Sequence, residues 1–239
     1  MIEAHLAKLR KRDDISADEE QAIRALVAET QEVPADKVFI RQDKPLEVST
    51  LLLEGIVCRY KDLKDGRRQI AQLHVAGDFV DLHSFTLKRL DHNLLSLTNC
   101  RIALIPHERL RDLTERFPHL TRVYWLMSNI DAAMSREWEL SLGRRDAAAK
   151  VAHLFCEMYI RLGVVGLCEG NTCPFPLIQT EIAECVGLTP VHVNRTLQEM
   201  RRQGLVELKS KRLFIPDFQR LKELAEFNPN YLYLEKRPR

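Results

Sequence analysis

Polar and basic side chains gather near the C-terminal end of the sequence, where their spacing suits contact with a nucleic acid. In residues 189–216 six basic residues stand against two acidic ones, a local excess of four positive charges. The basic residues are Arg195, Arg201, Arg202, Lys209, Lys211 and Arg212. A cluster of this kind neutralises phosphates and makes binding depend steeply on salt. Because the formal net charge of the whole chain is only +2, affinity for nucleic acid must come from this cluster.

Two short helices and a hairpin can present these side chains. Apolar residues recur at the spacing of one helix face over residues 182–188 and again over residues 193–200, so two helices can share a small core. Gly187 permits a tight turn between them, and Thr189 followed by Pro190 is a typical helix start. Gly204 ends the second helix. LVELK and RLFIP, joined by a Ser210-Lys211 turn, then predict two strands that form a wing.

The outer surface of the second helix is the predicted reading surface. With the apolar residues turned inward, the residues left outside near the helix start are Val191, His192, Asn194, Arg195 and Gln198. Isolated helix-turn-helix patterns arise often by chance, so a solvated helix and hairpin in an ordinary domain is the alternative. The wing and the helix cap favour a winged helix-turn-helix that binds double-stranded DNA.

This segment resembles the DNA-binding domain of the cyclic-AMP receptor protein and the fumarate and nitrate reduction regulator (Crp/Fnr) family, and the likeness continues through IPDFQRLKELAEF. The resemblance implies base contacts from Pro190, Val191 and Arg195. A glutamate commonly stands where this chain has Val191, so the half-sites of well-known members are not expected here. The predicted DNA-binding residues are Gln179, Thr180, Thr189, Pro190, Val191, His192, Asn194, Arg195, Gln198, Lys209, Lys211 and Arg212.

Short β-prone runs separated by turns predict a small antiparallel β-roll over residues 38–105. It resembles the cyclic-nucleotide-binding roll of the same family, with GDFVDLHSF in the place of the phosphate-binding cassette. The chain lacks the arginine that holds the cyclic phosphate in nucleotide-binding members, and Asp81 would repel an anion. Cyclic AMP is therefore not the expected effector, and the effector stays unidentified. The predicted pocket residues are Gly77, Asp78, Asp81, His83, Ser84 and Asn93.

Two helices are predicted around the roll. Ser16 and Glu19 form a capping box that begins a helix over Ala17–Glu29. A long helix over about His119–Leu142 carries an apolar stripe that fits either a coiled-coil seam or burial against its own barrel. The resemblance favours dimerisation through this helix. The predicted dimer-helix residues are Val123, Met127, Ile130 and Met134.

The cysteines leave two redox interpretations open. Cys185 lies in the first helix of the predicted motif, where oxidation would oppose DNA binding, so it is a candidate redox switch. The alternative is a small apolar filler. Cys168 and Cys173 flank a loop and could form a redox pair, but their spacing fits no known motif, which favours two loop thiols. Because the six cysteines are scattered, reduced thiols are expected.

No enzymatic motif accompanies these features. The sequence contains no nucleophile elbow, phosphate loop, zinc-binding helix or paired acidic motif, so we expect no enzyme. His74, His83 and His92 show no metal-ligand spacing, and no metal or cofactor is predicted. The start of the sequence lacks the apolar centre of a signal peptide, and no apolar run could span a bilayer, which favours the cytoplasm and no membrane partner.

Together these patterns predict an α+β chain with a β-roll sensor domain at 1–118, a dimerisation helix and hinge at 119–145, and a winged helix-turn-helix at 146–239. The expected function is sequence-specific transcription regulation by a homodimer on an inverted-repeat operator, with RNA polymerase as a further partner. The alternative is a cyclic-nucleotide-binding-like regulatory module that acts mainly through protein contacts.

Overall fold

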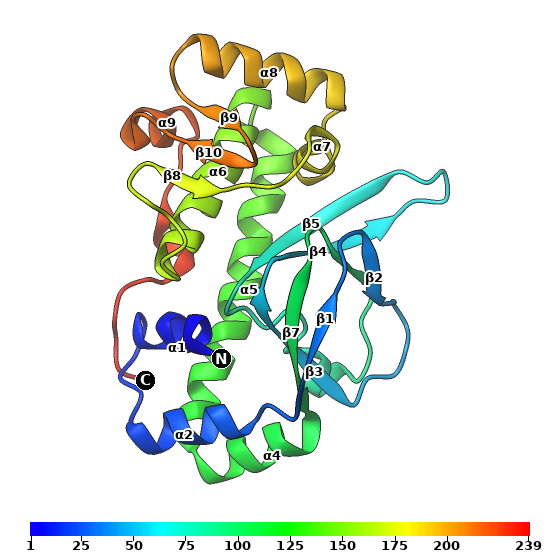
Figure 1. The fold of residues 1–239 in the computed structure, drawn as a ribbon, viewed down its shortest axis with the longest axis vertical. Coiled ribbons are helices and arrows are strands. Elements are labelled where there is room, and N and C mark those ends of the chain that lie inside the picture. Colours follow the sequence, from blue (N-terminus) through cyan, green and yellow to red (C-terminus); the bar gives the residue numbers. More distant parts are fainter.

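A computed structural model describes residues 1–239, and it has the predicted α+β architecture. An antiparallel roll lies beside one long helix, and a smaller domain with a helix pair and a β wing caps one end (Figure 1). The helix α8 lies at the far end of the molecule from α2 and α4 (Figure 1). The helix that carries most of the predicted reading surface thus lies at one end of the molecule (Figure 1).

The roll consists of two antiparallel sheets. One sheet has the strand order β1-β7-β3, and the other has the order β2-β6-β4-β5. The strands are β1 (Glu29–Val33), β2 (Lys37–Ile40), β3 (Val48–Glu54), β4 (Ile56–Asp62), β5 (Arg68–Val75), β6 (Asn93–Ser96) and β7 (Cys100–Pro106). Their burial follows from apolar side chains such as Leu52, Val57 and Leu94, which are fully buried between the sheets.

Four short helices surround the roll: α1 (Glu3–Arg10), α2 (Ala17–Ala25), α3 (Ser84–Leu87) and α4 (His107–Arg116). The capping box of Ser16 and Glu19 is confirmed, but α2 ends at Ala25 because Glu29 already pairs with β7 as the first residue of β1. Helix α1 was not predicted from the sequence. It packs against the turn at Gly77, where an added Cβ would lie 2.6 Å from the carbonyl carbon of Ala4.

The long helix α5 (Pro118–Arg144) packs against its own roll along the predicted stripe. Val123, Ile130 and Met134 are buried within the protomer, and Met127 is half-buried. The sequence left two interpretations of this stripe open, a coiled-coil seam and burial against the barrel. The positions of these residues agree with burial against the barrel. Their assignment as a coiled-coil seam has to be corrected, because a side chain already covered by its own roll is not available to a second helix.

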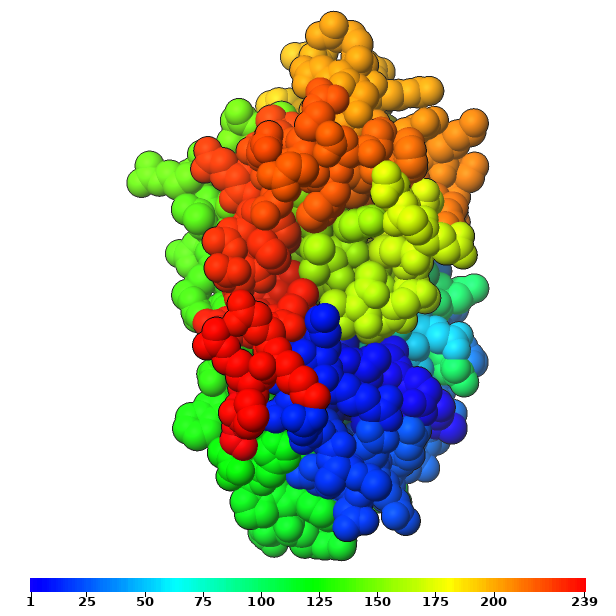
Figure 2. Space-filling view, turned by 90° about the vertical axis from the view of Figure 1, so that its left-hand side faces the viewer, coloured from blue at the N-terminus to red at the C-terminus, as the bar shows by residue number.

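The remaining elements form the smaller domain. They are α6 (Ala147–Val164), β8 (Thr172–Pro174), α7 (Gln179–Val186), α8 (Pro190–Arg202), β9 (Glu207–Lys209), β10 (Arg212–Phe214), α9 (Phe218–Leu224) and the 3-10 helix η1 (Pro229–Leu232). The last residues then run back along the molecule, so that the C-terminal segment lies against the N-terminal one (Figure 2). The backbone N–H of Arg237 donates to the carbonyl of Arg12 at 2.9 Å, which fixes this return.

Candidate nucleic-acid interface and its link to the roll

The start of α8 is fixed by the residues that the sequence singled out. The Thr189 hydroxyl accepts the His192 backbone N–H at 3.2 Å, and Pro190 occupies the first turn. Gly187 has a φ of +66°, a left-handed conformation that favours glycine between the two helices. Val193 and Met200 are fully buried beneath the helix. The opposite face of α8 is consequently held toward solvent.

Six of the twelve predicted DNA-binding residues lie on α8, and the others lie at the start of α7, at the Thr189 cap and on the wing. All twelve of them are exposed except Asn194, which is half-buried. Asn194 donates to the Gln179 side chain at 3.0 Å and accepts from Gln198 at 3.0 Å, so a row of amides connects α7 to α8. Val191 is 70% exposed, an unusual position for a β-branched side chain without a partner. The surface therefore offers amide, guanidinium and methyl groups together, which are the groups that read base edges.

Ion pairs divide the basic cluster into two groups. Arg202 pairs with Glu199 at 2.6 Å, Arg212 with Glu169 at 3.2 Å, and Arg201 lies 3.9 Å from Glu207. The side chains of Arg195, Lys209 and Lys211 form no ion pair and no hydrogen bond within the chain, and all three are exposed. These three cations are the ones with free donors for phosphates or bases.

The wing contains one strand more than the sequence indicated. Strands β9 and β10 form the predicted hairpin, with Ser210 and Lys211 both at positive φ, as a tight two-residue turn requires. Strand β8 pairs with the other side of β10, with Cys173 opposite Leu213. A Gly-Asn turn before Thr172 was the sequence signal for β8. This sequence signal is weak because a strand of three residues is too short to show an alternation of apolar and polar side chains.

The helix-turn-helix is docked on the roll through α7 and β5. The Gln69 side chain donates to the backbone carbonyl of Glu184 at 2.7 Å. Cys185 is buried at this junction, in a core that also contains Cys58 and Ile70 of the roll. Burial raises the pKa of the Cys185 thiol well above its usual value. The expected position of Cys185 beside bound DNA is therefore corrected, since its side chain points into the core.

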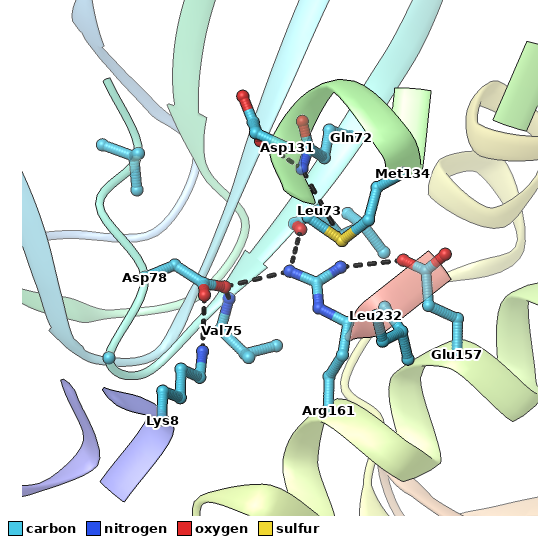
Figure 3. A network of polar contacts seen from close by, with 12 residues as sticks. Lys8, Gln72, Leu73, Val75, Asp78, Asp131, Met134, Glu157, Arg161 and Leu232 are labelled. Atoms are coloured by element: carbon cyan, nitrogen blue, oxygen red, sulfur yellow. Dashed lines mark hydrogen bonds and ion pairs between the residues drawn. The ribbon is translucent and has the colours of Figure 1, made fainter. Parts of the chain in front are cut away.

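A buried ionic network reinforces this junction (Figure 3). Arg161 of α6 donates to Glu157 at 2.8 Å, to Asp78 at 2.9 Å and to the Leu73 carbonyl at 2.7 Å. Lys8 of α1 donates to the other oxygen of Asp78 at 2.5 Å. The network thus connects the smaller domain, the roll and the N-terminal helix through a single guanidinium.

Two comparisons with protein families match these two halves of the chain. Residues 30–117 match the cyclic nucleotide-binding domain, and residues 149–224 match the Crp-like helix-turn-helix domain. The nitrogen fixation regulation protein FixK of Bradyrhizobium diazoefficiens is 31% identical over 73% of this chain and 72% of its own length. The chain belongs to the Crp/Fnr family. It is accordingly a DNA-binding transcription regulator and not an enzyme.

Other members of the family support the same assignment. The transcriptional activator protein FnrL of Cereibacter sphaeroides is 27% identical over 80% of this chain and 78% of its own length. The structure of FixK2 from Bradyrhizobium japonicum superposes with a TM-score of 0.77 at 25% identity, covering 85% of this chain and all of that one. No helix combines the length and the apolar character that crossing a membrane requires.

A cavity of about 390 Å³ lies between α5 and the roll, which is the part of the chain that matches the cyclic nucleotide-binding domain, and α1, α6 and the C-terminal segment also line it. Asp78 and His83 line it, but the other predicted pocket residues do not. Gly77 contacts α1, and the Asn93 side chain accepts the Gln42 backbone N–H. The Ser84 hydroxyl lies 3.1 Å from the Ser49 hydroxyl and 3.1 Å from Nε2 of the His107 ring. Only two of the six residues are thus brought together at the cavity.

An arginine that the sequence analysis missed does reach this cavity. Arg59 of β4 donates to Asp131 of α5 at 2.9 Å, to Gln72 at 2.9 Å and to the Val80 carbonyl at 3.1 Å. No motif marks it, because the strand and the helix that face each other are far apart in the sequence. These three bonds use its two terminal nitrogens, while the buried Nε has no partner within the chain.

Asp81 is turned away from the cavity, contrary to the prediction that it repels an anion there. It is fully buried and accepts the Thr50 backbone N–H at 2.5 Å. Burial raises the pKa of Asp81 to about 7. Because its proton is held more firmly in the folded state than in the unfolded one, Asp81 lowers stability as pH rises from about 4 to about 7.

Replacing Asp81 with asparagine should remove this pH-dependent cost while keeping an acceptor for Thr50. We expect the stability of Asp81→Asn relative to wild type to rise between pH 5 and pH 8, by on the order of 3 kcal/mol. Urea unfolding of both proteins at the two pH values measures the difference. Equal differences at pH 5 and pH 8 would show that the Asp81 carboxyl is already ionised at pH 5.

Proposed function

We propose that the protein regulates transcription as a homodimer that binds an inverted repeat in double-stranded DNA. The observation that carries this proposal is the outer face of α8, where the side chains of Val191, His192 and Arg195 are exposed. Side chains that carry amide groups lie beside them. A rigid helix start with such groups fits the major groove. The unpaired Lys209 and Lys211 on the wing are placed to contact phosphates on either side of that groove.

We also propose a division of labour between three parts of the chain. We assign residues 1–118 to sensing, residues 119–145 to dimerisation and hinge, and residues 146–239 to DNA binding. The proposal includes RNA polymerase as a partner, supported by the name of FnrL as a transcriptional activator. A protein that acts on bacterial DNA is placed in the cytoplasm. The alternative, a regulatory module that works through protein contacts alone, would leave the exposed face of α8 without a role.

A mobility-shift experiment with genomic fragments tests the proposal. The protein should retard specific fragments in the presence of excess random DNA, and the affinity should fall steeply as salt is raised from 50 to about 200 mM. If the protein retards no fragment at low salt, or binds all fragments equally, the proposed sequence-specific function does not hold.

The exposed face of α5 is the proposed dimer surface in place of the buried stripe. Trp125 is 68% exposed and Leu140 is 50% exposed, and they flank Asn129, Ala132 and Arg136 along one side of the helix. Large apolar side chains exposed on a monomer commonly mark an interface. Two copies of α5 packed along this side would place two α8 helices on two half-sites.

Trp125→Glu should weaken dimerisation roughly tenfold or more, because an aromatic anchor is lost and a charge is added at the helix pair. Sedimentation over a range of protein concentrations measures this. Leu87→Glu is the matched control, since Leu87 is 58% exposed on α3, outside the long helix. A wild-type protein that remains monomeric on its DNA, or a Trp125→Glu protein that sediments like Leu87→Glu, would exclude this surface.

Cyclic AMP is not the effector that we propose. Four of the five cations at the cavity are paired with carboxylates, and the fifth, Arg12, donates to the backbone carbonyls of Lys8 and Leu232. A cyclic phosphate would thus compete with carboxylates for four of the five cations, and breaking a buried pair is costly. Micromolar binding of cyclic AMP by calorimetry, with a matching gain in DNA affinity, would contradict this.

A further inference from the structure

Cys168 and Cys173 stand at the base of a small hairpin beside the wing. Between them, Glu169 and Thr172 form an antiparallel bridge in which each backbone N–H donates to the other's carbonyl, at 2.8 and 3.0 Å. Gly170 occupies the first turn position with a φ of +54°, as a two-residue hairpin turn requires. The two cysteines are the next facing pair outward from this bridge.

The facing position suits a disulfide. Outward from a hydrogen-bonded pair, an antiparallel ladder has a non-hydrogen-bonded pair whose Cα atoms lie roughly 4.5 Å apart. Disulfides join residues with Cα separations of roughly 4.4 to 6.8 Å. The two thiols of this structure are reduced, and the Cys168 thiol donates to the Tyr159 carbonyl at 3.4 Å. Little backbone movement is needed to bring one sulfur onto the other.

The two thiols differ in reactivity. The neighbouring Cys173 thiol, together with the nearby Arg212 guanidinium, lowers the pKa of the half-buried Cys168 thiol. The neighbouring Cys168 thiol and burial raise the pKa of Cys173, which is fully buried. By contrast, burial raises the pKa of Cys58 to about 12 and that of Cys156 to about 12. Cys168 is the thiol that most readily ionises, and ionised thiols are the ones that oxidants attack.

We propose that Cys168 and Cys173 form a reversible disulfide when the protein meets a hydroperoxide. The Cys168 thiolate attacks the peroxide oxygen, which forms a sulfenic acid and releases the alcohol, or water when the oxidant is hydrogen peroxide. The Cys173 sulfur then attacks the Cys168 sulfur, and the hydroxyl group leaves as water with the Cys173 proton. The two thiols lose two electrons and two protons in total, and the peroxide bond takes them up.

The disulfide acts on the wing through strand β8. The Phe175 N–H donates to the Lys211 carbonyl at 2.8 Å, and the Ile215 N–H donates to the Asn171 carbonyl at 2.9 Å. The first bond joins the residue after β8 to the wing turn, and the second joins the residue after β10 to the turn of the hairpin between the two cysteines. Closing the hairpin with a covalent bond limits its opening, so oxidation stiffens the support of Lys211. Formation of the disulfide does not depend on DNA binding. The proposed disulfide and the proposed DNA-binding function can therefore be disproved independently of each other.

Peroxide treatment followed by mass spectrometry tests the site. The full-length protein should lose two hydrogens, and a proteolytic digest should contain a cross-linked peptide with Cys168 and Cys173, which a dithiol reductant releases. Cys168→Ser should abolish the cross-link while retaining the fold, because this side chain is half-buried at the surface. Cys156→Ser, a buried cysteine of α6 outside the hairpin, is the matched control and should keep the cross-link.

Hydrogen exchange tests the coupling to the wing. We expect exchange of the Phe175 and Ile215 amides to slow by roughly tenfold or more on oxidation of wild type, and to stay unchanged in Cys168→Ser. A sulfinic acid at Cys168 with no cross-link, a disulfide between two copies, or an unchanged exchange rate in the cross-linked protein would each overturn the proposal.

Discussion

Arg161→Ala should lower the free energy of unfolding by about 3 to 5 kcal/mol, the largest effect expected from any single change in this protein. The substitution leaves two buried carboxylates without their shared partner, those of Asp78 and Glu157. Glu157 keeps hydrogen bonds from Trp138 at 2.9 Å and from Tyr231 at 2.8 Å, and Asp78 keeps Lys8. These bonds do not replace a guanidinium, because the charge of Glu157 stays uncompensated.

Urea unfolding measures the loss. Arg111→Ala is the matched control, since Arg111 is exposed on α4 without an ion pair, and it should change the stability by less than about 0.5 kcal/mol. Burial alone would raise the pKa of Asp78, but Lys8 and Arg161 hold it well below its usual value. A group with a depressed pKa stabilises the fold above its unfolded pKa, so the difference between wild type and variant should shrink below about pH 4.

Arg161→Ala also tests whether the network links the roll to the DNA-binding domain. If the network fixes the direction of α8, Arg161→Ala should raise the exchange of amides in α6 and α7 more than in the sheet β1-β7-β3. A variant as stable as Arg111→Ala, with unchanged exchange, would show that the buried carboxylates are hydrated and that the network does not hold the domains together.

Arg195→Ala should cost about 1 to 3 kcal/mol of specific DNA binding, which is roughly five- to 150-fold in affinity. Arg195 is exposed near the start of α8 and has no partner within the chain, so its guanidinium is free to bond two acceptors of a guanine. Competition assays against random DNA measure the specific part of the binding.

Lys211→Ala is the matched comparison for that experiment. Lys211 lies at the tip of the wing and is expected to contact a phosphate, so its loss should weaken all sequences similarly and reduce the salt slope by about one. If Arg195→Ala weakens specific and random DNA to the same degree, Arg195 contacts the backbone and the base-reading role falls to other residues of α8.

Local signals in the sequence predicted much of the DNA-binding domain. The Thr189-Pro190 cap, the Gly187 turn and the Ser210-Lys211 turn each determine the backbone within a few residues, and the structure has all three. The capping box at Ser16 behaved in the same way. Such features can be predicted from the sequence because the side chain that determines the backbone lies within a few residues of the position it affects.

Contacts between distant segments were not predictable in this way. An apolar stripe on α5 requires burial but does not say which surface buries it, and the roll rather than a second helix covers Ile130 and Met134. Arg59 and Asp131 meet across the cavity although 72 residues separate them. The direction in which Asp81 points depends on its bond to Thr50, and no spacing rule describes that pair.

Selection of DNA duplexes from a random pool, followed by footprinting of the enriched sequence, tests the central claim most directly. The account predicts an enriched inverted repeat whose half-sites are centred about 10 base pairs apart, protected together by a dimer and lost in Arg195→Ala. Enrichment of no sequence, or protection of a single half-site by a monomer, would contradict it.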